Sequence, residues 1–64
     1  MTVFKLKYRK QGPHTVVTIF AGGHRDNLAL CGTLTFLHEE WLDFDDLLRR
    51  HNERGTEIIM EEQK

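Results

Sequence analysis

The chain has a single cysteine, a single proline and no long apolar run among its 64 residues. One cysteine cannot form a disulfide within the chain, so a secreted scaffold held by disulfides is excluded and a reducing compartment is expected. No stretch approaches the roughly 20 apolar residues of a membrane-spanning helix. The first residues alternate as a strand does and lack the pattern of a secretion signal. We therefore expect a cytoplasmic protein without a membrane segment.

The chain is also short of the material for a large core. A domain of this size buries only about 60% of the surface that its unfolded chain exposes, so a lone monomer is expected to be marginally stable. Small domains usually compensate with disulfides, a metal, very good packing or a second subunit. We expect one domain over residues 1–64, and a homodimer as the missing source of stability.

Net charge is small, but it is unevenly distributed. Residues 1–36 carry five Lys or Arg and one Asp, a balance of +4, whereas residues 37–64 carry nine acids and four Lys or Arg, a balance of −5. The sum is the net charge of −1. Such asymmetry can direct a charged partner to one face of a protein, or it can be satisfied internally or between two copies.

Alternating and β-branched patterns predict three strands in the first half of the chain. Residues 2–9 alternate, residues 14–21 are rich in Val, Thr and Ile, and the sequence LALCGTLTF indicates a third strand over residues 28–36. Gly12-Pro13 is typical of a turn between the first two. In the third strand the alternation places four large apolar residues on the face of Gly32, the expected site of a bulge or bend: Leu28, Leu30, Leu34 and Phe36.

The period then changes to that of a helix over residues 38–53, with an apolar arc around Trp41, Phe44 and Leu48. Gly55 is a suitable left-handed residue at its end. Residues 56–61 predict a short last strand. The sequence therefore predicts an α+β fold of order β-β-β-α-β, an antiparallel meander with one amphipathic helix packed on one face and a short C-terminal strand parallel to a neighbour.

The stretch FAGGHRDNLALCG, residues 20–32, is the first place to look for chemistry. Its glycines lie between two strands and lack the helix start of a phosphate loop, so GGHRDN is interpreted as a six-residue hairpin loop. Cys31 has no evident activating group, and the spacings of the four histidines match no zinc pattern. We expect no catalytic residue, no metal site and no cofactor, and hence no enzyme.

Apolar residues that one helix cannot cover indicate a protein interface. The second and fourth strands carry apolar residues on both faces, and Leu42 lies outside the apolar arc of the helix. The candidate interface residues are Val16, Phe20, Leu42 and Ile59, because clustered exposed apolar residues typically mark a contact surface.

The passage LTFLHEEWLDFDDLL resembles strand-to-helix passages of small bacterial and phage proteins. Together these features predict a non-enzymatic regulatory or accessory protein that acts as a homodimer and binds or blocks a larger protein. Candidate contacts with that partner are the helix acids and the hairpin loop: Glu39, Asp43, Asp46, His24 and Arg25. The alternative is a small nucleic-acid or nucleotide binder that uses the basic face of the first strand, with candidate contacts Lys5, Lys7, Arg9 and Arg25.

Overall fold

The computed structural model describes residues 2–63. Its elements are β1 (Val3–Gln11), β2 (His14–His24), β3 (Asn27–Leu37), α1 (His38–Glu53) and β4 (Glu57–Glu62). The strands form one sheet of order β3-β2-β1-β4, in which β1, β2 and β3 are antiparallel neighbours and β4 pairs parallel to β1. The predicted α+β class and the β-β-β-α-β order are confirmed.

The helix occupies the predicted range, but the strands extend beyond theirs. β1 ends at Gln11 and β2 continues through His24, so the hairpin loop between β2 and β3 shrinks to Arg25-Asp26. The six-residue loop expected for GGHRDN is therefore wrong, because its glycines remain in the sheet. The first hairpin has Gly12 at a φ of 62°, the left-handed conformation that a tight turn with Gly at its first central position requires.

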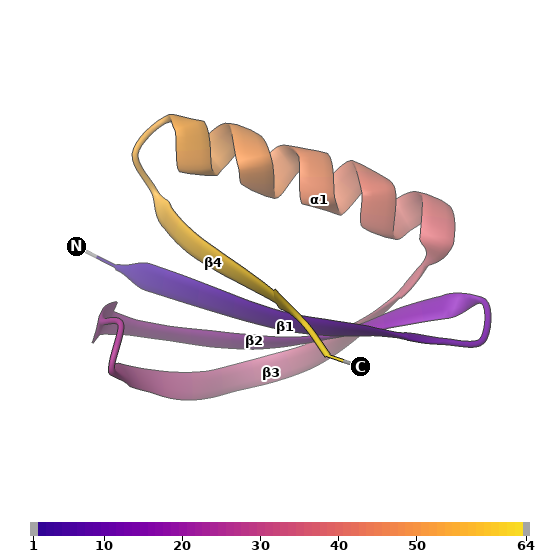
Figure 1. Cartoon of the computed structure of the whole chain (residues 1–64), viewed down its shortest axis with the longest axis horizontal. Coiled ribbons are helices and arrows are strands. Elements are labelled where there is room, and N and C mark those ends of the chain that lie inside the picture. Colours follow the sequence, from indigo (N-terminus) through magenta and orange to yellow (C-terminus); the bar gives the residue numbers. More distant parts are fainter. Residues whose placement is uncertain (1, 64) are drawn as a thin grey trace.

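The helix lies over one face of the sheet, as Figure 1 shows. Trp41 is the buried residue of α1, and it meets Leu6 and the fully buried Val17 in the centre of the core. The Trp41 ring lies 5.0 Å from the Tyr8 ring and 6.2 Å from the Phe36 ring, measured between centroids. Aromatic pairs at such distances contribute beyond their buried area. We call this side of the sheet the covered face.

Both ends of α1 are fixed by hydrogen bonds that the sequence encodes. At the start, the Glu40 carboxylate accepts a hydrogen bond from the Leu37 backbone N–H at 2.8 Å. At the end, Gly55 adopts a φ of 104° and the Thr56 N–H donates to the His51 carbonyl at 3.1 Å. Within residues 2–63, no helix is both long and apolar enough to cross a membrane.

A bulge in β3 places Leu30 on the opposite side of the sheet from Leu34 and Phe36. The register shifts between Ile19 and Phe20, where Gly32 pairs with Ile19 and Leu30 pairs with Phe20, so Cys31 is the extra residue. Leu34 and Phe36 consequently face the helix, whereas Leu30 shares the opposite side with Phe20. The prediction that Leu28, Leu30, Leu34 and Phe36 share one face is wrong, although the bulge lies beside Gly32 as expected.

The other side of the sheet has no helix over it within the described residues, and we call it the open face. Strand alternation and pairing place on it Val3, Lys5, Lys7 and Arg9 from β1, Val16, Thr18, Phe20 and Gly22 from β2, Leu30, Thr33 and Thr35 from β3, and Glu57, Ile59 and Glu61 from β4. One helix and one sheet thus leave a surface of mixed apolar and charged residues.

Candidate functional site

A row of cations runs along β1 through the middle of the open face. Lys5, Lys7 and Arg9 are alternate residues of this central strand, and on β4 Ile59 lies beside Lys5 and Glu61 beside Lys7. The Lys5 ammonium lies 3.1 Å from the Glu61 carboxylate. The Lys7 ammonium lies over the Phe20 ring, 5.5 Å from its centroid, in a cation–π arrangement. Among the described residues, neither Lys7 nor Arg9 has a carboxylate within 4.0 Å.

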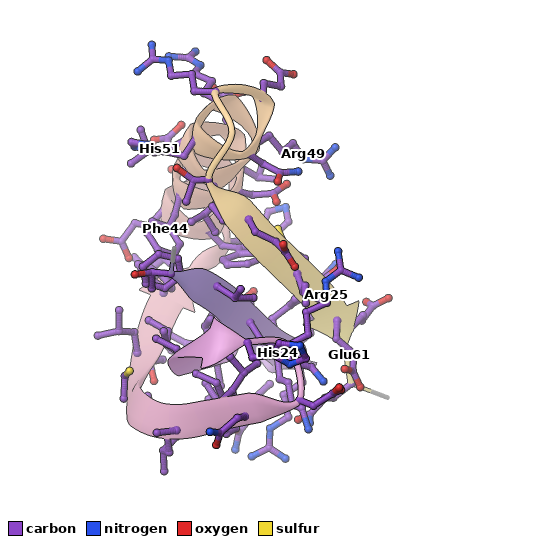
Figure 2. The ribbon with its side chains drawn as sticks, turned by 90° about the vertical axis from the view of Figure 1, so that its left-hand side faces the viewer. His24, Arg25, Phe44, Arg49, His51 and Glu61 are labelled. Carbon is purple, nitrogen blue, oxygen red and sulfur yellow. The ribbon has the colours of Figure 1, made fainter. Side chains whose placement is uncertain are left out.

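The tip of the β2–β3 hairpin returns over one end of this face. The Arg25 guanidinium pairs with the Glu57 carboxylate, which joins the hairpin tip to the first residue of β4. Val3 lies between Gly22 and Glu57 in the sheet and is only 5% exposed, although no helix covers it. Figure 2 shows His24, Arg25 and Glu61 together on the side of the sheet opposite Phe44.

Gly22 makes the return of the hairpin possible. A Cβ at this position would lie 2.2 Å from the Asn27 carbonyl oxygen and 3.2 Å from the Leu28 Cα. The chain of β3 therefore crosses directly over Gly22, on the open face. At Gly23 a Cβ would meet nothing within 4 Å, so only the first glycine of the pair is required by packing.

The returning hairpin and the cation row enclose a shallow hollow of about 220 Å³. Its walls combine charged and apolar side chains from three strands and the hairpin tip: Lys5, Lys7, Phe20, Arg25, Asp26 and Leu28. Sequence reasoning found its cations and Phe20. It missed Leu28, because the alternation of β3 placed that residue on the covered face.

Three of the four candidate interface residues lie on the open face. Val16, Phe20 and Ile59 are all partly exposed there. Leu30, whose position the bulge reverses, joins them with 65% of its surface exposed. Leu42 is 52% exposed but belongs to α1, so the structure does not bring it to this surface.

The acids proposed as partner contacts are exposed on α1, away from the open face. Glu39, Asp43 and Asp46 are all exposed. Asp46 lies 2.7 Å from Arg50, and the neighbouring Asp45 lies 3.2 Å from Arg49. These pairs offset the charge of Asp45 and Asp46, and among residues 2–63 the other two candidate acids, Glu39 and Asp43, have no ion pair.

His24 has a structural contact within the hairpin. Its Nδ1 accepts a hydrogen bond from the Asp26 backbone N–H at 3.2 Å, which requires that nitrogen to be unprotonated. Its side chain is exposed, as is Cys31 at the bulge. Within the described part of the chain, no hydrogen bond joins Cys31 to a histidine, and no three His, Cys, Asp or Glu side chains gather as metal ligands would.

A second hollow of about 310 Å³ opens between α1 and the sheet, and no sequence signal pointed to it. Its lining is almost entirely apolar and includes Phe4, Ile19, Phe44 and Ile58, with His51 at the last turns of the helix. It continues the core toward the end of the sheet where β2 and β3 carry only small residues on the covered face, such as the pair Ala21 and Ala29.

Comparison with protein-family models, with curated protein sequences and with solved structures finds no match to this chain.

The close approach at Gly22 gives the first testable prediction. Replacing Gly22 by Ala should lower the free energy of unfolding by about 1–3 kcal/mol, the usual cost of forcing extra atoms into a packed site. Gly23→Ala is the matched control, and it should be neutral or slightly stabilising because Ala restricts the unfolded chain. Urea denaturation followed by Trp41 fluorescence measures both. Equal stability of the two variants would contradict the account of the hairpin.

Proposed function

We propose that this chain is a small non-enzymatic interaction protein of the bacterial or phage accessory kind. In this proposal it works in the cytoplasm as a homodimer and binds or blocks a larger protein partner. It acts by occupying a surface of that partner, which needs complementary contact and no chemistry at the site.

One observation carries the proposal: the open face combines partly exposed apolar residues with cations, and within the described residues no helix lies over it. Val16, Phe20, Leu30 and Ile59 supply the apolar area. Exposed apolar area rimmed by polar residues is typical of protein contact surfaces. Arginine and aromatic residues are enriched at the energetic centres of such surfaces, and Arg9 and Phe20 meet that description.

The charges of the open face indicate the chemistry of the partner. Glu61 and Glu57 already pair with Lys5 and Arg25, so Lys7 and Arg9 remain to contact the partner. We infer that the partner presents an apolar patch with carboxylates at its border. Glu39 and Asp43 of α1, which suit a basic partner, are the rival contact on the opposite side of the molecule, and we place the contact on the open face.

Variants of the two surfaces distinguish these contacts. The wild-type chain and each variant are immobilised and exposed to a cytoplasmic extract of the organism that encodes the chain. The captured proteins are quantified by mass spectrometry. Replacing Lys7 and Arg9 by Glu should reduce capture of the specific partner at least tenfold, about the loss expected when complementary rim charges become like charges. The helix variant E39K/D43K is the matched control, with the same number of charge reversals, and should retain capture.

Two results would count against this assignment. Loss of the partner from the helix variant, with capture retained by the open-face variant, would move the contact to α1. If the immobilised wild-type chain captures no protein in greater amount than an immobilised, denatured sample of the same chain does, the proposal of a partner-binding function is wrong. Circular dichroism of each variant confirms beforehand that the fold is retained.

Nucleic-acid binding is the second candidate function, because Lys5, Lys7 and Arg9 line one strand and Arg25 lies on the same side of the sheet. The ion pairs of Lys5 and Arg25 reduce its support, since paired cations are less available to neutralise phosphates. Tyr8 does not contribute an exposed stacking ring, because it packs against Trp41 on the covered face.

Fluorescence anisotropy with labelled DNA and RNA at two salt concentrations tests this second function. We expect dissociation constants weaker than about 100 µM at physiological salt, the weak limit of non-specific binding, because only two cations of the row are unpaired. The triple variant K5A/K7A/R9A should then behave as the wild type does. Tight, salt-sensitive binding that this variant loses would instead establish a nucleic-acid binder.

A further inference from the structure

β3 forms one edge of the sheet, and apart from its bulge it lacks the features that usually protect an edge. Natural edges are kept from pairing with other chains by charged residues, proline, bulges or short length. β4 at the other edge fits this description, with six residues of which Glu57, Glu61 and Glu62 are acidic. β3 has 11 residues, and none of Asn27–Leu37 is charged or a proline.

The regular part of this edge follows the bulge. Cys31 interrupts the ladder, so residues 32–37 form the uninterrupted strand segment, with the sequence GTLTFL. Threonine, leucine and phenylalanine in alternation favour an extended strand. Thr33, Leu34 and Thr35 are exposed, and so is Leu37 at its end. An edge strand of this kind presents a row of unpaired backbone N–H and C=O groups.

Charge identifies a second copy of the chain as the occupant of this edge. In a dimer with two-fold symmetry the same patch meets itself, so a patch whose unpaired charges have one sign meets like charge. The open face would oppose its Lys7 and Arg9, and the β4 edge would oppose its glutamates. β3 carries no charge, so it is the strand of this sheet that can pair with itself without repulsion between side chains of the two copies.

The surface area of the chain supports the same occupant. The folded chain exposes 4776 Å², whereas a compact monomer of 7.6 kDa exposes about 4300 Å² by the scaling of surface with mass. The exposed leucines of β3 account for part of this surface: Leu30, Leu34 and Leu37. A second copy paired along residues 32–37 would cover Leu34 and Leu37 in both chains at once, whereas Leu30, which precedes the bulge, stays on the open face.

We propose that β3 pairs antiparallel with β3 of a second copy, about a two-fold axis perpendicular to the sheet through residues 32–37. The dimer then contains one continuous sheet of eight strands, in which both helices lie on one side and both open faces on the other. This inference rests on the homodimer of the proposed function and gives its geometry. A partner with two binding sites would meet two open faces held at a fixed distance, which raises avidity without any new contact.

Sedimentation analysis from low micromolar to several hundred micromolar protein tests the dimer, and amide hydrogen exchange locates it. As the dimer forms, the outward-pointing amides of residues 32–37 should exchange at least tenfold more slowly, while the outward amides of β4 keep their rates. Replacing Thr33 and Thr35 by Lys places charges on the proposed contact and should weaken dimerisation at least tenfold, because like charges then meet across the two strands. N52K/Q63K is the matched control: it adds the same charge at exposed sites of α1 and the chain end, and should dimerise as the wild type does.

Each result decides a different part of the proposal. A dimer whose β3 amides gain no protection would overturn the edge pairing while leaving self-association intact. A monomer at every concentration would overturn both, although partner binding by the open face would still stand or fall on its own experiment. If T33K/T35K does not fold, the exchange pattern of the wild-type chain alone decides the edge pairing.

Discussion

The packing of Trp41 against the covered face of the sheet is the interaction on which the rest of the structure depends. Its ring is in contact distance of the rings of Tyr8, Phe36 and Phe44, and its burial holds α1 across three strands. A single 16-residue helix cannot cover both sides of a four-stranded sheet. Everything proposed about function concerns the surface that α1 leaves uncovered, namely the open face and the β3 edge.

Charge divides this uncovered surface into parts with different uses. The open face carries cations, of which the acids on β4 neutralise only some, so it is suited to a partner of complementary charge. β3 carries none, so it is suited to a copy of itself. In the proposed arrangement the same short chain self-associates along one strand and still presents its sheet to another protein, because the two contacts use different groups: backbone amides at the edge and side chains on the face.

The sequence predicted the order of the elements, the bounds of α1 and the presence of apolar residues on both faces of β2, since each depends on local periodicity. It also placed Val16, Phe20 and Ile59 away from the helix. It did not predict the reversal of Leu28 and Leu30, because strand alternation contains no information on whether a bulge inserts an extra residue. Nor did it predict the pairing of Arg25 with Glu57, since two residues separated by 32 positions meet only through the sheet order.

Leucine methyl groups provide the most direct test of the claim that β3 and the open face, and not the helix, form the functional contact surface. Five leucines are strongly exposed, three on β3 and two on α1: Leu30, Leu34, Leu37, Leu42 and Leu47. In dilute solution a soluble paramagnetic probe should broaden the methyl resonances of all five. On self-association the account predicts that Leu34 and Leu37 lose this broadening while Leu42 and Leu47 keep it. Protection of the two helix leucines instead, with β3 still accessible, would contradict the account.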